Sequence, residues 1–375
     1  MGLATKRLAA LAAVGSLTLL GAAPQAQAHR AEHGHGERRP MAVVQRSVSF
    51  KVRNVNRSKI RCAADGKTYT VRGHVTGPKS AFEHPGAVTL FLHGLSYGEF
   101  FGNFEAQPGY NFARKQARAG HVTATVDRLG YDSSDKPVGT GICFGSRADI
   151  AHQIVLQLRS GHYRSDERHD RSSAFSKVVL AGHSVGAIIA QAEAYSFGDI
   201  DGLMVLSYSD TTVSAAAQKA LKVAVAQCKA GGERSGGTTG PGGYVYFGAA
   251  TPQQFIAAHF FTPNADPSVV RATAKMRNRD PCGDITSYNK AVVADFDNLY
   301  RIHVPVLVLI GTKDAIYPTR AADQASLLTG SHDVTTVNIA RTGHALTLHY
   351  SRNEFSDAVS RWLSRHHFGD HHDER

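Results

Sequence analysis

Cysteine and tryptophan are scarce in this sequence, and long hydrophobic runs are missing after its first residues. The chain of 375 residues contains 4 cysteines and 1 tryptophan. No C-x-x-C spacing occurs, so the sequence gives no indication of a zinc site built on such a motif or of a dithiol redox centre. No later stretch is apolar enough for the roughly 20 residues that span a bilayer as a helix.

Acidic residues are outnumbered, but the excess of basic residues follows no pattern. The formal net charge is +11, and lysine and arginine are scattered along the chain. No nucleic-acid-binding motif accompanies this charge, so we expect no nucleic-acid partner. The excess predicts solubility and a weak attraction to an anionic cell envelope.

The first 28 residues are typical of a secretory signal peptide. Lys6 and Arg7 give a basic start, residues 8–22 are apolar, and a small-x-small site predicts cleavage after Ala28. No cysteine precedes Cys62, which excludes a lipid-modified N-terminal cysteine, and no twin arginine occurs in the basic start. The sequence therefore predicts a secreted, extracellular protein exported by the general route.

An even number of cysteines in an exported protein predicts two disulfides. Four cysteines allow three pairings. We favour Cys228–Cys282, because both residues lie in an insertion described below, and this choice leaves Cys62–Cys143.

Residues 176–195 organise the chain around one serine. Residues 178–181 form a short apolar run, typical of a buried parallel strand, and residues 187–195 are typical of a helix. Between them, residues 182–186 read G-x-S-x-G with Ser184 at the centre. A strand that passes directly into a helix leaves a sharp turn, and Gly182 and Gly186 allow the flanking backbones to approach closely.

This segment resembles the nucleophile elbow of the α/β-hydrolase family. Residues 87–92 form another apolar run that leads into a His-Gly pair, which resembles the family's oxyanion-hole segment. The resemblance implies that the backbone N–H groups of Leu95 and Val185 are the two oxyanion donors. Residues 127–134 resemble the family's D-R-x-G-x-G-x-S loop, with Asp132 in place of the second glycine, and we expect Asp127 and Arg128 to hold this loop.

Two later segments complete the resemblance and imply a catalytic triad. An apolar run over 304–311 is followed by Asp314, as in the family's G-x-x-D segment after strand seven. His344 follows the last expected strand, residues 334–339. The chain order Ser184, Asp314, His344 is that of α/β-hydrolases.

Other residues compete for two of these roles. Asp210 is the alternative acid, because some family members carry the acid after strand six. His349 is a weaker alternative base. We expect His183, inside the elbow, to pack rather than react.

The resemblance implies an α/β-hydrolase fold: a mostly parallel eight-stranded sheet flanked by helices, with a helical cap inserted after strand six. We expect a signal peptide (1–28), a flexible leader (29–45), the hydrolase core in two parts (46–210 and 301–365), a cap or lid (211–300) and a disordered tail (366–375). Thr251 and Asp266 each precede a proline and predict helix starts in the cap. Either the substrate pocket or the cap's own core could hold the cap aromatics Tyr244, Tyr246, Phe247, Phe255, Phe260 and Phe261.

The implied function is that of a secreted serine hydrolase, carboxylesterase- or lipase-like, that cleaves esters through an acyl-enzyme. This chemistry needs no metal or organic cofactor, and its partner is a small-molecule ester or lipid. An amidase, a peptidase or an acyltransferase would use the same triad. A protein of another class, a secreted binding protein without catalysis, could share the fold.

Overall fold

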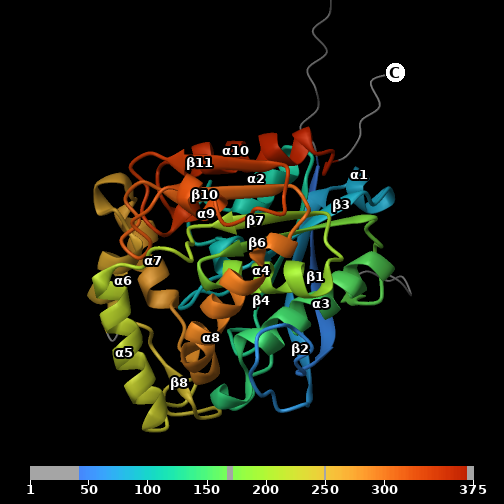
Figure 1. Cartoon of the computed structure of the whole chain (residues 1–375). Coiled ribbons are helices and arrows are strands. Elements are labelled where there is room, and N and C mark those ends of the chain that lie inside the picture. The colour runs from blue at the N-terminus through green and yellow to red at the C-terminus, as the bar shows by residue number, and fades with distance from the viewer. Residues whose placement is uncertain (1–41, 167–171, 249–250, 370–375) are drawn as a thin grey trace, which may run out of the picture. The chain divides into compact units, whose positions relative to one another are not determined.

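A nine-stranded sheet forms the centre of the structure (Figure 1). The computed structural model describes residues 42–166, 172–248 and 251–369. The expected signal peptide and most of the expected leader lie outside these residues. The sheet order is β11-β10-β7-β6-β3-β4-β2-β1-β5. Its strands are β1 (Val43–Arg53), β2 (Thr68–Pro78), β3 (Ala87–Leu92), β4 (Val122–Asp127), β5 (Arg164–Ser165), β6 (Lys177–His183), β7 (Gly202–Leu206), β10 (Val306–Gly311) and β11 (Val334–Ile339).

The sheet is mostly parallel, as expected. Strands β4, β3, β6, β7, β10 and β11 pair in parallel, whereas β2 is antiparallel to β4 and β1 is antiparallel to β2. The eight long strands agree with the predicted eight. The ninth strand, β5, contributes two residues beside β1 and was not predicted, because a two-residue pairing leaves no periodic pattern.

Helices cover both faces of the sheet. Those outside the cap are α1 (Ser80–Glu83), α2 (Phe112–Arg118), α3 (Phe144–Ser160), α4 (Val185–Phe197), α9 (Ala321–Ala325) and α10 (Arg352–Arg365). On β3, Leu90 packs in the cluster that contains α3 and α4, whereas its neighbour Phe91 packs in the cluster that contains α2 and α10. Successive strand residues point to opposite faces, so each parallel strand must be apolar throughout.

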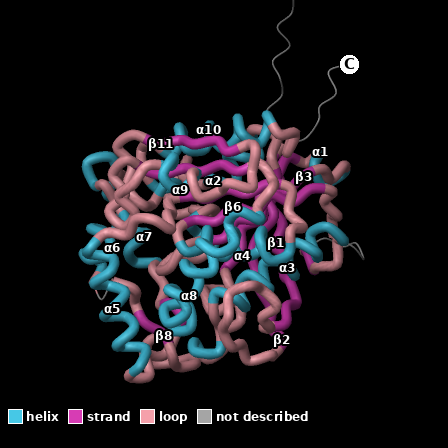
Figure 2. The backbone as a smooth tube through the Cα atoms, viewed as in Figure 1, coloured by secondary structure: helices cyan, strands magenta, loops and turns pink. Residues whose placement is uncertain are grey.

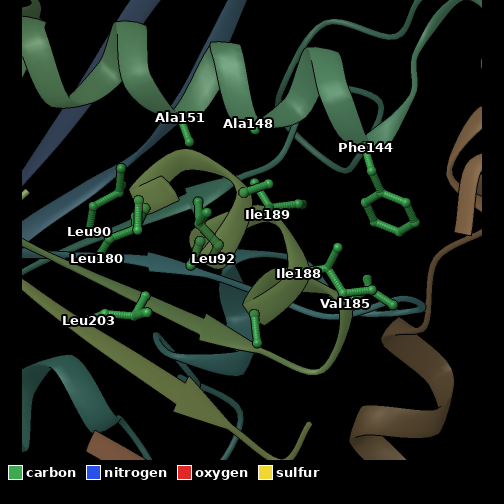
Figure 3. Packing of buried hydrophobic residues seen from close by; sticks show 14 of the residues in the cluster. Leu90, Leu92, Phe144, Ala148, Ala151, Leu180, Val185, Ile188, Ile189 and Leu203 are labelled. Atoms are coloured by element: carbon green, nitrogen blue, oxygen red, sulfur yellow. The ribbon is translucent and has the colours of Figure 1, made fainter. Parts of the chain in front are cut away.

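Helix α4 packs against both the sheet and its neighbour α3. Figure 3 shows Ile189 of α4 among Leu92 and Leu180 of the sheet and Ala148 and Ala151 of α3. Small residues such as alanine let the two helices approach closely, and this packing fixes the helix that begins directly after Ser184.

The stretch of chain that connects β7 to β10 forms a second group of helices, the cap (Figure 2). It consists of α5 (Ala215–Lys229), α6 (Pro252–His259), α7 (Pro267–Met276) and α8 (Cys282–Asn298), with a small antiparallel sheet of β8 (Tyr244–Val245) and β9 (Asp280–Pro281). Thr251 and Asp266 are the N-cap residues of α6 and α7, and their side chains accept hydrogen bonds from backbone N–H groups of the first turns. Both predicted helix starts are therefore confirmed. The insertion follows the sixth long strand, β7. None of the helices in the described part of the chain is both long and apolar enough to cross a bilayer.

Two expected boundaries were wrong by a few residues. Strand β1 begins at Val43, inside the expected leader, because its backbone pairs with β2 as far as Pro78. The tail was expected to be disordered from residue 366, but Phe368 is buried and its ring centre lies 5.7 Å from that of Trp362. Apolar burial therefore extends the folded part to this aromatic pair, and residues 370–375 lie outside the described chain.

Both favoured disulfides are present. Cys62–Cys143 joins the β1–β2 connection to the start of α3, and Cys228–Cys282 joins α5 to α8 within the cap. The bonds close loops with sequence separations of 81 and 54 residues. Loops of this length remove considerable conformational freedom from the unfolded chain.

We expect the double variant Cys228→Ala/Cys282→Ala to lose about 2–4 kcal/mol of unfolding free energy, because the unfolded cap regains the freedom that the bond removed. Urea denaturation under oxidising conditions measures this loss. A reducing agent should destabilise the wild type further than the variant, which keeps only Cys62–Cys143. An unchanged urea midpoint in the variant would contradict a stabilising role for the cap disulfide.

Candidate active site

Ser184 lies at the turn between β6 and α4 in a backbone conformation that is rare for residues with a side chain. Its φ is 55° and its ψ is −128°. Its N–H donates to the carbonyl oxygen of Leu206 (2.8 Å), and its own carbonyl oxygen accepts from Ala187 N–H (2.8 Å). The turn is therefore held from both sides, as strained functional positions must be.

The two motif glycines are required by close backbone contacts. A Cβ on Gly182 would lie 2.2 Å from the carbonyl oxygen of Gly186, and one on Gly186 would lie 2.3 Å from that of Leu92. Real Cβ atoms do not approach backbone so closely. The G-x-S-x-G spacing thus follows from the packing of β3, β6 and α4 around one turn.

Asp314 and His344 come from the ends of neighbouring strands and form a buried pair. Nδ1 of His344 lies 2.8 Å from Oδ2 of Asp314, and both side chains are fully buried. Oδ1 of Asp314 accepts two backbone N–H groups, from Ile316 (2.9 Å) and Tyr317 (3.0 Å). The carboxylate is thereby fixed, and it favours the His344 tautomer with the proton on Nδ1 and a free lone pair on Nε2.

Nε2 of His344 has no hydrogen-bond partner among the described residues, so no hydrogen bond joins it to Ser184. His183, the residue before Ser184, connects the two: its Nε2 donates to the carbonyl oxygen of His344 (2.9 Å), and the two rings lie 4.6 Å apart. Catalytic hydrogen bonds are often long before substrate binds. The His183 ring also stacks on Phe101 at 4.0 Å, and burial lowers its pKa well below the usual value, so it packs as a neutral ring.

Asp210, the alternative acid, is bound elsewhere. Its carboxylate accepts from Tyr208 Oη, Gln191 Nε2 (3.2 Å) and Gln324 Nε2 (2.8 Å). Burial raises its pKa and raises that of neighbouring Asp295 well above the usual value. This cluster joins β7, α4 and α9 to the cap helix α8.

His349, the alternative base, is occupied by backbone groups. Its Nε2 accepts from the N–H groups of Phe261 (3.0 Å) and Gly343 (3.2 Å), and its Nδ1 donates to the carbonyl oxygen of Ala345 (2.7 Å). Burial lowers its pKa to about 4. Both ring nitrogens are hydrogen-bonded to backbone groups, so this histidine has a structural role.

The two expected oxyanion donors flank Ser184. The backbone N–H of Val185 is the first of α4, where it has no intrahelical acceptor. Leu95 follows the end of β3, and its N–H makes no hydrogen bond to the described residues. A Cβ on intervening Gly94 would lie 2.8 Å from Cβ of Ser184, so the two segments are in direct contact.

The segment that carries Leu95 is held by residues that the sequence did not single out. Asp280, on β9 of the cap, accepts from Ser96 N–H (2.6 Å) and from Tyr131 Oη (3.0 Å), and Ser96 has a positive φ of 66°. Burial raises the pKa of Asp280 to about 6. Behind the segment, Nη2 of Arg128 donates to the carbonyl oxygen of Gly94 (3.2 Å). The same nitrogen donates to Tyr131 Oη (3.2 Å) in the 127–134 loop that Arg128 was expected to hold.

A second buried carboxylate links the cap to the same arginine. Asp284, on the first turn of α8, contacts both Arg128 (3.4 Å) and Arg147 of α3, and all three side chains are almost fully buried. The cap therefore reaches the oxyanion segment through polar contacts. No pattern in the sequence marks Asp280 or Asp284, because cap and core residues more than 100 positions apart meet here.

A mostly apolar cavity opens above Ser184 between the core and the cap. The cavity volume is about 30 Å³. Its apolar wall includes Val213, Leu221, Phe247, Ile285, Tyr288 and Ile316. His259 of α6 also lines it: this ring lies 5.2 Å from that of His344, and its Nδ1 is 2.8 Å from Tyr97 Oη. The site is thus a short apolar chamber with Ser184 and Val185 on its surface.

Of the six cap aromatics, Phe247 lines this cavity. Phe255 and Phe260 pack in a buried apolar cluster, and Tyr244 donates its hydroxyl to the carbonyl oxygen of Pro137 (2.8 Å). Tyr246 stacks beneath Arg277 and Arg279. Phe255, Phe260 and Tyr244 therefore pack between the cap and the core, against Tyr97, His349 and Pro137.

Solved structures with the same fold include an esterase from Thermogutta terrifontis, which covers 85% of this chain and 99% of its own at 18% identity, with a TM-score of 0.57. A bromoperoxidase from Bacillus anthracis has a TM-score of 0.54 at 15% identity and covers 84% of this chain and 100% of its own. A hydrolase from Pseudomonas aeruginosa PA01 has a TM-score of 0.52 at 17% identity, with coverages of 81% and 96%. At these identities the likeness establishes the fold.

Comparison with curated proteins finds no match. The model of the alpha/beta hydrolase family matches residues 89–358, which contain the elbow, the Asp314–His344 pair and the cap. The matched region exceeds half of the chain, and its sheet order and strand-turn-helix elbow agree with the expected fold. The protein belongs to the alpha/beta hydrolase family.

Proposed function

We propose that this protein is a serine hydrolase that cleaves carboxylic esters through an acyl-enzyme. One observation carries the proposal: a strained serine lies at the surface of an apolar cavity, and its neighbour His183 contacts the buried Asp314–His344 pair. Nε2 of His344 has no hydrogen-bond partner among the described residues. Membership of the family supports hydrolase chemistry in general. The ester substrate and the serine mechanism rest on the site.

In the proposed reaction Oγ of Ser184 attacks the ester carbonyl carbon while Nε2 of His344 takes the hydroxyl proton. Asp314 stabilises the imidazolium and keeps the ring oriented. The negative charge that forms on the carbonyl oxygen is stabilised by the N–H groups of Leu95 and Val185. His344 then protonates the leaving alcohol. Water next attacks the acyl carbon while His344 takes its proton. The bond to Oγ of Ser184 breaks, His344 returns the proton to Oγ, and the carboxylic acid leaves.

The character of the cavity supports an acyl group that is short and apolar. Aliphatic and aromatic side chains form most of its surface, and no charged group other than Asp284 lines it. Asp284 is neutralised by two arginines, so the chamber offers no free charge of its own among the described residues.

Export to an oxidising compartment completes the proposal. Two disulfides account for all 4 cysteines, which suits an extracellular protein. The signal-like residues 1–28 supply the route. A small ester is the proposed partner, and no nucleic acid is involved.

We expect a fluorophosphonate probe to label the wild type and not Ser184→Ala, because the probe reacts only with an activated serine. Turnover of p-nitrophenyl esters should fall by roughly 10⁶ in the same variant. Ser356→Ala, which alters another buried serine on α10, serves as the control and should keep labelling and turnover. Equal labelling of Ser184→Ala and the wild type would refute the assignment, and a wild type that is never labelled would favour a binding protein.

We expect Asp314→Asn to lower kcat by about 10⁴, because an amide cannot hold His344 in the required tautomer. Asp210→Asn should keep kcat within about tenfold, because the Asp210 carboxylate bonds Tyr208, Gln191 and Gln324. We expect this substitution to lower the free energy of unfolding instead. Steady-state kinetics and thermal unfolding of both variants separate these effects. The opposite ranking of kcat would move the acid to Asp210.

We expect a preference for short-chain p-nitrophenyl esters over aminoacyl anilides, and Ala217→Phe should shift it to still shorter acyl chains by filling the cavity that Ala217 lines. Ala216→Phe, at the exposed neighbouring position of α5, should leave the chain-length profile unchanged. Faster cleavage of anilides would assign an amidase. Ester products formed with added alcohols in place of free acid would assign an acyltransferase.

A further inference from the structure

A cluster of three metal-ligating side chains lies on the outer side of α4, away from Ser184. His152 comes from α3, Glu193 from α4 and Asp199 from the connection between α4 and β7. One ligand atom from each residue lies within 4.8 Å of the other two. Glu193 is nine positions after Ser184, which along a helix corresponds to about 13 Å. The cluster is therefore separate from the active site.

Glu193 makes this cluster unusual among buried carboxylates. Its side chain is 0% exposed, and neither of its oxygens has a hydrogen-bond partner among the described residues. Nδ1 of His152 and both carboxylate oxygens of Asp199 also lack hydrogen-bond partners there. Burying a carboxylate without a partner costs several kcal/mol, so a proton or a cation must compensate for its charge. Burial, reinforced by Asp199, raises the pKa of Glu193 well above its usual value.

The ligand atoms converge at ion-pair distances. Nδ1 of His152 lies 2.9 Å from Oδ2 of Asp199 and 3.8 Å from Oε1 of Glu193, yet these contacts do not have hydrogen-bond geometry. The His152 ring is held by stacking on Phe197 at 4.0 Å and 7°. A tetrahedral ion with bonds of about 2.0–2.2 Å holds its ligand atoms about 3.3–3.6 Å apart. The two distances from His152, 2.9 and 3.8 Å, lie on either side of that range.

Arg159 lies beside the cluster, but its guanidinium pairs with other groups. The guanidinium of Arg159 donates to the backbone carbonyl oxygen of Asp199 (2.6 Å) and pairs with the carboxylate of Asp201 (2.6 Å). It therefore satisfies groups beside the cluster and leaves the carboxylates of Glu193 and Asp199 available as ligands.

We propose that His152, Glu193 and Asp199 bind a divalent transition-metal ion, with Zn²⁺ as the best match. One imidazole nitrogen with two carboxylates suits Zn²⁺, whereas Ca²⁺ and Mg²⁺ prefer ligand sets of oxygen alone. The side chains of His152 and Asp199 are 14% and 25% exposed, which gives the ion an entry path and room for a water as fourth ligand. The ion would fasten α3 to α4 and take no part in hydrolysis.

The rival explanation is a proton shared between Glu193 and Asp199. The variant Glu193→Gln separates the two, because glutamine has nearly the same shape and can donate a hydrogen bond to Asp199 but is a poor metal ligand. A shared proton predicts that this variant is at least as stable as the wild type. A metal site predicts that it loses the response to Zn²⁺.

The experiment uses the mature protein without an affinity tag, stripped with a chelator and then titrated with Zn²⁺, Mn²⁺, Ca²⁺ or Mg²⁺. Thermal unfolding and calorimetric titration are measured for the wild type, His152→Ala, Glu193→Gln and Asp199→Asn. His162→Ala, at an exposed histidine just after α3, is the matched control. It corrects for weak binding by the other histidines, of which the chain has 20 in all.

We expect the wild type and His162→Ala to bind one equivalent of Zn²⁺ in a saturable step and to unfold several degrees higher with it, with little response to Ca²⁺ or Mg²⁺. Each of the three cluster variants should lose that step, so the test stands even if one of them fails to fold. Retention of the step and the thermal shift in His152→Ala and Glu193→Gln would overturn the proposal. Absence of any saturable step in the wild type would also overturn it and assign the shared proton.

Discussion

The backbone at Ser184 is the constraint on which the rest of the structure depends. A residue with a side chain at φ 55° persists only where its surroundings leave no alternative. Here the N–H of Ser184 is tied to β7, and Gly182 and Gly186 allow β6, α4 and β3 to approach within distances that exclude a Cβ. The core on both faces of the sheet holds these elements in place. The strain at one serine is thus stabilised by packing that involves most of the chain.

The cap has a part in the site that goes beyond covering it. Asp280 bonds the N–H of Ser96, the residue next to the proposed oxyanion donor Leu95, and Asp284 contacts Arg128, which bonds Gly94. A change in the position of β9 or of the first turn of α8 would therefore alter the oxyanion segment. The cap thereby determines both the apolar walls of the cavity and the geometry of the donors beneath it.

The buried carboxylate clusters outside the Asp314–His344 pair differ in how their oxygens are paired. The clusters around Asp210, Asp280 and Asp284 are hydrogen-bonded to amide, hydroxyl, guanidinium or backbone groups, as buried polar groups normally are. In the cluster of His152, Glu193 and Asp199 the carboxylate oxygens have no hydrogen-bond partner in the described part of the chain, and the ligand atoms face one another at ion-pair distances. That difference, rather than the residue types, is what singles it out. It also places a proposed ion at residues that no sequence motif marks.

The sequence alone determined the sheet, the elbow and the cap and favoured the two disulfide pairings, because each rests on local signals: apolar runs, G-x-S-x-G, proline after a capping residue, and cysteines grouped by region. It also placed Asp314 and His344 directly after strands, and the parallel sheet brings such positions to one edge. Only the tertiary structure separated Asp314 from Asp210, since the choice depends on which carboxylate reaches the His344 ring. It alone revealed Asp280, Asp284 and the His152 cluster, because these contacts join residues from distant segments that no local pattern connects.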